Sequence, residues 1–433
     1  MNKQCCDIAV IGGGPAGMAA ALAACENGAG EVTIIERDYD LGGILPQCVH
    51  DGFGLLLMKE RLTGPEYAEI FKDRVQVAGI SCRLDTMVLE VSPPAATGED
   101  FVITVVNSRD GVCELSARAV ILAMGCRERT RAQVMIPGSR PAGIFTAGTA
   151  QRLVNIDGVL PGTRAVILGS GDIGLIMARR LTLEGVIVEG VYEILAQPSG
   201  LTRNVVQCLE DYNIPLHLSH TITEIHGNQR VEAVTVAQVD EKRQPIAGTE
   251  YKVACDTVIL SVGLIPENEL SEKAGVVIDE CTGGPCLDAH MQTSIPGLFA
   301  CGNVVNVYDL VDYVTMSAQV AGKGAADYIK SPGMNKTGLI PVKAGENVHF
   351  VVPQLIEKEI PASELTLYLR VQSTARDVRV KVRAGKKLLA SKRFKIVKPP
   401  EMVTINLKPQ DLRELMDAIV VEVVPAGSGK GGK

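Results

Sequence analysis

The sequence predicts an α/β protein in which two similar strand–helix–strand units are followed by a small all-β domain. Three observations lead to this fold class. A glycine-rich loop between a buried strand and a helix occurs twice before residue 175. Forty-four glycines and no tryptophan favour tight turns between strands and helices. Beyond residue 335, apolar and polar residues alternate, which is typical of strands with one buried face.

Length and composition bound the number and kind of domains. The 433 residues correspond to about three domains of ordinary size, and 46% of them are hydrophobic. Twelve cysteines in so long a chain, with no secretory signal, predict reduced thiols in a cytoplasmic protein. No membrane span is predicted, because the apolar run over residues 8–24 contains four glycines and a proline.

The first unit has the order strand, glycine loop, helix, strand, acid. A buried strand is predicted over residues 7–11, the loop reads G-G-G-P-A-G over 12–17, and the following helix ends at Gly28. A second strand over 32–35 leads into Glu36, 24 residues after the first glycine of the loop. This order is typical of Rossmann-like dinucleotide-binding domains.

Each residue of this loop has a physical task in binding a dinucleotide. Gly12 permits the tight turn, Gly14 lets the backbone approach a pyrophosphate, and Gly17 lets the helix pack closely on the strand. Pro15 suits the first helical turn, where no N–H bond is lost, and the helix start offers N–H groups to phosphates. Glu36 is predicted to accept hydrogen bonds from the ribose hydroxyls of an adenosine.

The same unit returns 157 residues later. A strand over 164–168 leads into G-S-G-D-I-G over 169–174, a helix to Leu183 and a strand over 186–192 that ends at Glu193. A glutamate at this position favours NADH over NADPH, because its charge would repel a 2′-phosphate. Two such sites predict two dinucleotides, one held permanently and one exchanging, with a hydride passing between nicotinamide and flavin.

These motifs resemble the two-dinucleotide-binding flavoproteins of the pyridine nucleotide–disulfide oxidoreductase superfamily. Three further segments match in order, at residues 119–125, 257–268 and 293–303. The resemblance implies that the first unit binds FAD, that the second binds NAD(H) or, less favourably, NADP(H), and that the second domain is inserted in the first.

The resemblance and a change in charge set the predicted domain boundaries. The FAD domain comprises residues 1–142 and 266–332, and the NAD domain residues 143–265. A small antiparallel β-sandwich or barrel is predicted over 336–425, and 426–433 are predicted to be a disordered tail. Residues 336–433 carry 18 Lys and Arg against 10 Asp and Glu, whereas the first 335 residues have a net charge of −15.

The resemblance assigns a set of cofactor-contacting residues. Those expected at FAD are Gly12, Gly14, Pro15, Ala16, Gly17, Glu36, Arg37, Gly42, Gly43, Ile44, Gly125, Gly302, Asn303, Asp309 and Leu310. Those expected at NAD are Gly169, Gly171, Asp172, Ile173, Gly174, Glu193 and Gly263. Asn303 stands where the family normally has an acid that holds the ribityl chain. No cluster has the spacing of a metal site.

Two acids are predicted to cap helices. Asp172 is expected to accept N–H groups at the start of the helix that follows the second glycine loop. Asp309 is expected to cap a helix that runs through Gln319, and the start of that helix is expected to face the flavin pyrimidine.

Two more specific resemblances point to particular groups of enzymes within this superfamily. Residues 41–55, 62–67 and 309–312 resemble the FAD-dependent oxidoreductase that accompanies anaerobic glycerol-3-phosphate dehydrogenases. Residues 141–151 resemble the α subunits of sarcosine, opine and proline oxidoreductases. The resemblance implies an electron-transferring subunit of an oligomer, whose partner is a second flavoprotein dehydrogenase or a small redox protein.

The family's paired active-site thiols are missing from their usual place. Disulfide reductases carry C-x4-C after the Gly-Gly that corresponds to Gly42-Gly43, but here Leu45 and His50 stand at those positions and Cys48 is alone. A dithiol needs Cα atoms within about 7 Å of each other. Disulfide reduction by this route is therefore not expected.

Cys48 and His50 are the candidate catalytic residues beside the flavin. A histidine there could move a proton as flavin N5 changes redox state, because its pKa lies near working pH. The alternatives are a histidine bonded only to the backbone and a thiol that serves only packing.

Three functions remain open: an NADH-linked FAD oxidoreductase subunit, a self-contained NADH-dependent reductase of a small organic substrate, or a subunit without nicotinamide chemistry. The basic C-terminal domain is expected to cover the flavin edge, to form an oligomer interface or to dock an acidic partner. Nucleic-acid binding is disfavoured, because the net charge of −7 is acidic and no binding motif is present.

Overall fold

The structure is a computed structural model that describes residues 4–96, 98–331, 338–357, 364–412, 415 and 417–427. The chain forms two compact units. The first unit comprises Met1–Leu45, Gly52–Cys126 and Pro266–Lys433, and the second comprises Pro46–Asp51 and Arg127–Ile265. Among the described residues, no helix is both long enough and apolar enough to cross a membrane. The predicted tail lies almost wholly outside the described residues.

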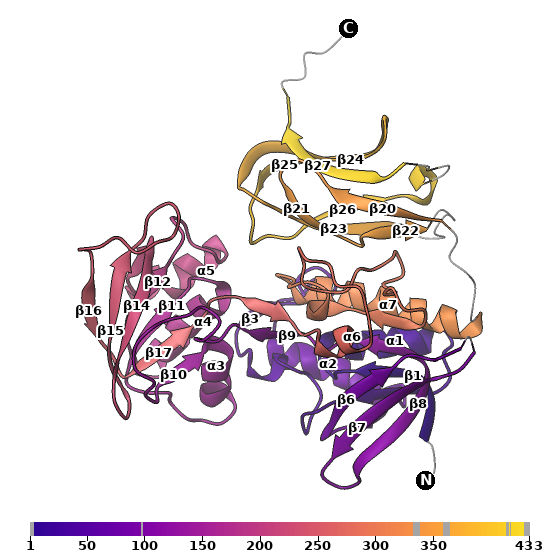
Figure 1. The fold of residues 1–433 in the computed structure, drawn as a ribbon, viewed down its shortest axis with the longest axis horizontal. Coiled ribbons are helices and arrows are strands. Elements are labelled where there is room, and N and C mark those ends of the chain that lie inside the picture. Colours follow the sequence, from indigo (N-terminus) through magenta and orange to yellow (C-terminus); the bar gives the residue numbers. More distant parts are fainter. Residues whose placement is uncertain are drawn as a thin grey trace. The chain divides into compact units, whose positions relative to one another are not determined.

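The first unit is built on a seven-stranded sheet with the order β5-β2-β1-β8-β7-β6, with β19 pairing β8 (Figure 1). Its strands are β1 (Gln4–Ile11), β2 (Val32–Ile35), β5 (Ser81–Arg83), β6 (Thr86–Ser92), β7 (Phe101–Asn107), β8 (Gly111–Leu122) and β19 (Leu298–Ala300). The central strand β1 runs parallel to both β2 and β8. The carboxyl ends of these strands therefore lie at one edge of the sheet, where the first glycine loop begins.

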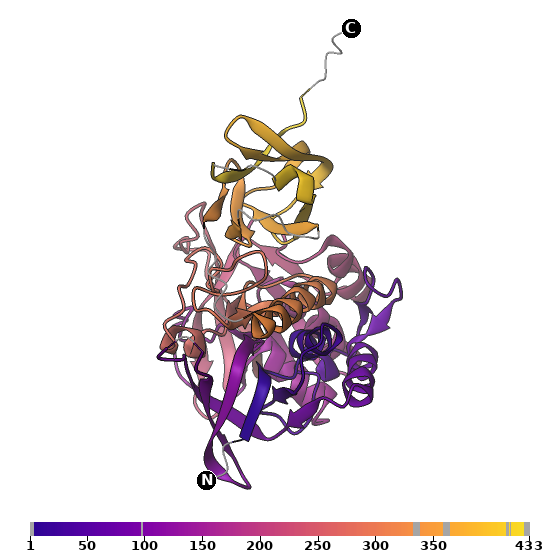
Figure 2. The same cartoon turned by 90° about the vertical axis from the view of Figure 1, so that its right-hand side faces the viewer.

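Three helices accompany this sheet: α1 (Pro15–Glu26), α2 (Gly64–Val77) and α7 (Val311–Lys330). Helices α1 and α7 lie side by side (Figure 2). At Gly322 of α7, a Cβ atom would collide with the carbonyl oxygen of Ala20, so the close approach requires glycine. Helix α2 begins in a capping box, in which Thr63 and Glu66 each bond the other's backbone N–H.

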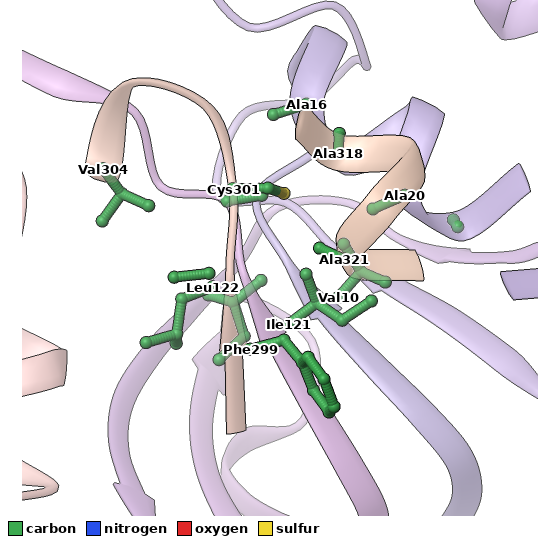
Figure 3. Close-up of a cluster of buried hydrophobic side chains, with 14 of the residues drawn as sticks. Val10, Ala16, Ala20, Ile121, Leu122, Phe299, Cys301, Val304, Ala318 and Ala321 are labelled. Atoms are coloured by element: carbon green, nitrogen blue, oxygen red, sulfur yellow. The ribbon is translucent and has the colours of Figure 1, made fainter. Parts of the chain in front are cut away.

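The apolar core between this sheet and these helices includes Cys301. Figure 3 shows its thiol among side chains of β1, β8, α1 and α7, including Val10, Ile121 and Ala318. Cys301 has no exposed surface, and burial raises the pKa of its thiol. It therefore behaves as a small apolar core residue.

The second unit contains a five-stranded parallel sheet with the order β10-β17-β11-β12-β13. Its strands are β10 (Ile144–Thr146), β11 (Arg164–Leu168), β12 (Ile187–Glu193), β13 (Leu216–Leu218) and β17 (Thr257–Leu260). Its helices are α3 (Ala147–Asn155), α4 (Asp172–Leu183) and α5 (Thr202–Cys208). A three-stranded antiparallel sheet follows, made of β14 (His220–Gly227), β15 (Val231–Gln238) and β16 (Tyr251–Ala254).

The second unit begins earlier than the predicted boundary at residue 143. Residues 127–142 belong to it because their backbone is bonded to its strands. The Ser139 N–H donates to Ile225 O at 3.0 Å, and the Ala142 N–H donates to Gln229 O at 3.0 Å. The Arg131 guanidinium also donates to backbone carbonyls of residues 136–139, which fixes that turn.

The remaining short elements complete the two units. Two two-stranded sheets pair β3 (Asp51–Phe53) with β4 (Leu62–Thr63) and β9 (Cys126–Glu128) with β18 (Leu264–Pro266). Helix α6 (Glu269–Lys273) belongs to the first unit.

The C-terminal part of the first unit is an all-β domain of two sheets (Figure 1). One has the order β22-β20-β27-β24-β25 and the other β21-β23-β26. The strands are β20 (Leu339–Ala344), β21 (Val348–Val352), β22 (Leu355–Glu357), β23 (Leu365–Val371), β24 (Ala375–Ala384), β25 (Lys387–Val397), β26 (Val403–Leu407) and β27 (Ile419–Pro425). The predicted sandwich is not wholly antiparallel, since β20 and β27 run parallel.

This domain, called the C-terminal β domain below, is fastened to the rest of the first unit by direct contacts. The ring of Tyr368 lies edge-on to Tyr308, with centroids 5.4 Å apart. The Arg370 Nη2 donates to Val307 O at 2.8 Å, and the Gln354 N–H donates to Leu287 O at 3.1 Å.

Candidate functional site

The first glycine loop has the close backbone approaches that its sequence predicts. Gly12 has a φ of +104°, and a Cβ atom there would lie 2.5 Å from the carbonyl oxygen of Ala123. A Cβ atom at Gly17 would overlap the carbonyl oxygen of Gly12. At Gly14 the nearest atom to such a Cβ is 3.8 Å away, and no side chain caps the start of α1. The helix start therefore offers N–H groups that no side chain caps, as a phosphate requires.

Other predicted residues of the first unit gather around the start of α1. The Gly42 N–H donates to Gly13 O at 2.9 Å. At Gly43, where φ is +57°, a Cβ atom would lie 3.0 Å from the Cα of Gly14. A Cβ atom at Gly302 would lie 2.6 Å from the Cβ of Ala16, which brings the segment after β19 to the same helix start.

Glu36 is 7% exposed and keeps acceptor capacity on both carboxylate oxygens. Its Oε2 accepts the N–H of Gly13 at 2.5 Å, and its Oε1 accepts the N–H of Asp38 at 2.8 Å. Each oxygen can accept a second hydrogen bond. Glu36 can therefore receive a pair of ribose hydroxyls. Arg37, the next residue, is exposed.

Asn303 is bonded within the first unit through both atoms of its amide. The Asn303 Oδ1 accepts the N–H of Tyr308 at 3.1 Å, and its Nδ2 donates to the Cys126 Sγ at 3.6 Å. The amide thus already fixes its own loop, with one donor hydrogen and one acceptor position left over.

The prediction that Asp309 caps a helix is wrong. Helix α7 begins at Val311, and its N-cap residue Leu310 makes no side-chain cap. The Asp309 Oδ2 instead accepts the N–H of Met402 in the C-terminal β domain at 2.9 Å. Burial raises the pKa of the Asp309 carboxyl. The partner lies 93 residues further along the chain, which no local pattern reveals.

Buried polar atoms without partners lie at the start of α7. Asp312 has no exposed surface, and its Oδ1 accepts the N–H groups of Leu56 and Leu57 at 3.1 and 2.9 Å. Within the described residues, its Oδ2 and both amide atoms of Asn306 lack hydrogen-bond partners. Such atoms suit a polar ligand that completes their bonding. Together with the open helix start at Gly14, they fit a bound flavin nucleotide.

The second glycine loop repeats the first in geometry. Gly169 has a φ of +97°, and a Cβ atom at Gly174 would lie 2.6 Å from the carbonyl oxygen of Gly169. No side chain caps α4, whose N-cap residue is Gly171. Gly263 has a φ of +104°, and its carbonyl accepts the N–H of Arg129 at 3.0 Å. Ile173 lies in the first turn of α4 and packs against the core of the second unit.

Glu193 is more heavily bonded than its counterpart Glu36. It is 3% exposed, and its Oε2 accepts the N–H and the hydroxyl of Ser170 at 2.9 and 2.5 Å and the hydroxyl of Ser199 at 2.8 Å. Its Oε1 accepts the N–H of Leu195 at 3.0 Å. Sequence reasoning missed the two serines, although the contrast between G-S-G and G-G-G at the same loop position was a visible signal.

The prediction that Asp172 caps α4 is also wrong. Its Oδ1 accepts the N–H of Leu201 at 2.8 Å and the Nδ2 of Asn204 at 2.7 Å. These bonds hold the loop that follows β12 against the second glycine loop. At Gly200 a Cβ atom would lie 2.8 Å from the carbonyl oxygen of Ser170, so only glycine allows this approach.

Cys48 belongs to the second unit, through the segment Pro46–Asp51. The neighbouring Gln47 Nε2 donates to Gly148 O at 2.9 Å and to Gln151 Oε1 at 3.1 Å. The Cys48 Sγ lies 3.8 Å from Gln151 Oε1, and burial raises the pKa of the thiol to about 12. The thiol is therefore protonated at neutral pH, which disfavours a nucleophilic role.

His50 lies in the same segment and the same unit. Its Nδ1 is 3.2 Å from Asp51 O, and burial lowers its pKa, with Asp172 and Asp51 opposing this shift and Arg203 adding to it. The imidazole is thus neutral at pH 7. The structure groups Cys48 and His50 with the second glycine loop, whereas Gly42, Gly43 and Ile44 belong to the first unit.

The twelve cysteines all lie in the described ranges, and none of them forms a disulfide. In the same ranges, no three His, Cys, Asp or Glu side chains are arranged to hold a metal ion.

Two Rossmann-like loops, each with a buried glutamate at the end of its second strand, are typical of flavin- and nicotinamide-dependent oxidoreductases. Residues 6–325 match the sequence model of the family described as pyridine nucleotide-disulphide oxidoreductase. The chain belongs to this family, which uses FAD and NAD(P)H. The match ends before the C-terminal β domain.

Curated relatives are similar over much of this chain. The hydrogen cyanide synthase subunit HcnB of Pseudomonas protegens is 29% identical over 321 residues, which is 68% of this chain and 65% of the relative. An opine oxidase subunit of Agrobacterium tumefaciens is 24% identical over 74% of this chain and 64% of its own length. The NADH dehydrogenase of Bacillus subtilis is 28% identical over 76% of this chain and 59% of its own length. The chain thus spans under two thirds of these relatives.

Solved structures share the fold. The thioredoxin reductase of T. acidophilum superposes with a TM-score of 0.62 at 23% identity, over 76% of this chain and 100% of its own. The L-proline dehydrogenase of P. horikoshii gives a TM-score of 0.51 at 22% identity, over 76% of this chain and 55% of its own.

Proposed function

We propose that this chain is the NADH-linked FAD subunit of a cytoplasmic multi-subunit oxidoreductase. It exchanges a hydride between NADH and FAD and passes electrons to or from a partner dehydrogenase. The observation that carries the proposal is the pair of glycine loops, each with an uncapped helix start and a buried glutamate. A chain that held one dinucleotide would need only one glycine loop with its helix start and glutamate.

The first unit is proposed to hold FAD. Gly14 and the start of α1 receive the pyrophosphate, Glu36 receives the adenosine ribose, and the start of α7 lies toward the flavin. FAD held by these residues would supply a two-electron acceptor for the hydride of NADH, with a proton from solvent balancing the reduction.

The second unit is proposed to hold NADH in exchange. Gly171 and the start of α4 receive the pyrophosphate, and Glu193 faces the ribose with the remaining acceptor position on Oε1. The carboxylate repels a 2′-phosphate and so favours NADH over NADPH. Neutral His50 is proposed to hold or accept a proton near the reacting ring.

Electron transfer is proposed to proceed without an active-site dithiol. Cys48 stands alone in its segment, and its raised pKa of about 12 keeps it protonated. The reduced flavin would therefore deliver electrons directly to the next redox centre.

The partner is proposed to be a dehydrogenase of the glycerol-3-phosphate or amine and opine type. Support comes from residues 41–55 and 141–151, whose sequences resemble subunits of such enzymes. Two of the similar proteins, HcnB and the opine oxidase chain, carry the word subunit in their names. The similarity to an enzyme named NADH dehydrogenase, without that word, favours the alternative of a self-contained reductase.

Steady-state turnover of the purified chain separates these two functions. The subunit proposal expects NADH oxidation with an artificial electron acceptor but poor turnover of glycerol-3-phosphate or amines by the chain alone. Fast turnover of such a substrate by the isolated chain would contradict the subunit proposal and support the self-contained reductase.

A further inference from the structure

The net positive charge of the C-terminal β domain is concentrated in one hairpin. Strands β24 and β25 with their turn, residues 375–397, contain nine Lys and Arg and a single acid, Asp377. Arg393 pairs with Asp377 at 2.6 Å, and Arg383 pairs with Glu422 of β27 at 3.0 Å. With nine cations against one acid, the hairpin has a positive field that attracts anionic partners.

Two sheet edges lie open next to this charge. Strand β25 ends the five-stranded sheet and pairs with β24, and β26 ends the three-stranded sheet and pairs with β23. In the described part of the chain, neither strand has a second neighbour in its sheet. An open edge presents unpaired backbone N–H and C=O groups that can bind another strand.

A groove of 340 Å³ lies where residues of the two edge strands come together. It is lined by Ala390, Ser391 and Lys392 of β25 and by Thr404, Ile405 and Asn406 of β26. The Lys392 Nζ donates to Thr404 O across it at 3.3 Å, which uses one of the three donors of the ammonium. Two donors of Lys392 remain for a carboxylate inside the groove.

We propose that this groove binds an extended acidic segment of the partner subunit by strand addition. The main chain of the segment bonds to the open edge of β25. Its carboxylates pair with Lys392 and the neighbouring cations, and its apolar side chains contact Ala390 and Ile405. The proposal rests on the function proposed above, since it names where the electron-exchanging partner attaches.

The positive charge of the hairpin indicates which kind of strand binds in the groove. A second copy of this chain pairing through its own β25 would bring two rows of Lys and Arg together, which is repulsive. An acidic segment removes that repulsion. The groove lies outside residues 6–325, which match the family model.

Binding of a labelled probe peptide to the full-length flavoprotein tests the proposal. The probe alternates Glu and Val over about six residues, the usual length of a strand, and fluorescence anisotropy reports binding. A second probe of the same sequence carries N-methyl groups on alternate amides, which removes main-chain donors without changing charge. A Lys–Val peptide and a thymidine oligonucleotide are the comparison ligands.

The acidic probe is expected to bind, and the N-methylated probe is expected to bind at least about tenfold more weakly. Lys392→Gln is expected to weaken the acidic probe about tenfold. The control Lys395→Gln removes the same charge from an exposed position of the same strand outside the groove, and about threefold or less is expected. Far-ultraviolet circular dichroism verifies that both variants are folded.

Four results would overturn the proposal. They are no binding of the acidic probe, equal binding of both probes, equal loss in both variants, or tighter binding of the oligonucleotide. The N-methylated probe keeps the test decisive if Lys392→Gln does not fold. Reduction of the flavin by NADH is measured on the same samples. Failure of that reaction would contradict the proposed function, while failure of peptide binding alone would contradict only the docking groove.

Discussion

Glu36 and Glu193 occupy equivalent places in the two units but have different bonding. Each lies 24 residues after the first glycine of its loop and is buried. Glu36 accepts one N–H on each oxygen, whereas Glu193 accepts three donors on Oε2 and one on Oε1. The first carboxylate keeps an acceptor position on each oxygen, while Oε2 of the second is already saturated.

One loop position accounts for much of this difference. Gly13 gives Glu36 only its N–H, while Ser170 gives Glu193 both its N–H and its hydroxyl. A Cβ atom at Gly13 would lie 2.5 Å from the Leu41 Cδ2, so a serine there would have to displace the Leu41 side chain. With each net hydrogen bond worth about 1 kcal/mol, this difference supports the proposal that the first site holds its dinucleotide more tightly than the second.

The largest effect is expected from replacing the last glycine of each loop, one loop at a time, by alanine. Gly17→Ala places a Cβ atom on the carbonyl oxygen of Gly12, so we expect protein without FAD or without a stable fold. Gly174→Ala places a Cβ atom 2.6 Å from Gly169 O, so FAD is retained while the rate of flavin reduction by NADH falls about a hundredfold. The FAD-to-protein ratio measures FAD retention, and stopped-flow absorbance measures the rate of flavin reduction. Equal loss of FAD in the two variants would contradict separate sites.

A smaller effect is expected from removing the second glutamate. Glu193→Ala eliminates the repulsion of a 2′-phosphate, so the ratio of kcat/KM for NADH to that for NADPH is expected to fall about tenfold. The matched change Glu36→Ala is expected to weaken FAD retention and to leave this ratio unchanged. An unchanged ratio in Glu193→Ala would show that this carboxylate does not face the ribose.

The smallest effect is expected at Cys48. Because the pKa of this thiol is raised from 9.0 to about 12, its thiolate fraction at pH 8 is about a thousandfold below that of an ordinary cysteine. Iodoacetamide should label it far more slowly than the exposed Cys281 when both are mapped by mass spectrometry. Cys48→Ser should keep flavin reduction by NADH within about twofold of the wild-type rate. A hundredfold loss would mean that the thiol takes part in electron transfer.

Local sequence patterns predicted the strand, glycine loop, helix and second strand that begin each dinucleotide unit, because the causes of these elements are largely local. The left-handed turn at Gly12 and the proline in the first turn of α1 can be read from the glycine loop itself. Asp172 and Asp309 were assigned wrongly as caps, because their real partners, Leu201 and Met402, lie 29 and 93 residues away.

Tertiary packing decided the other features that the sequence did not reveal. The segment with Cys48 and His50 groups with the second unit because Gln47 is bonded to Gly148 and Gln151, about a hundred residues further on. The saturation of Glu193 depends on Ser199, which reaches it from the loop after β12. Likewise, the parallel pairing of β20 with β27 joins the first and last strands of the C-terminal β domain.

Anaerobic titration of the purified flavoprotein with NADH tests the central claim most directly. Hydride exchange between the two sites predicts that the visible absorption of oxidised FAD is lost with one NADH per flavin, and that NADPH is much less effective at equal concentration. The same titration of Gly174→Ala should leave most of the absorption in place on the same timescale. Wild-type protein that keeps its FAD absorption in excess NADH would contradict that exchange.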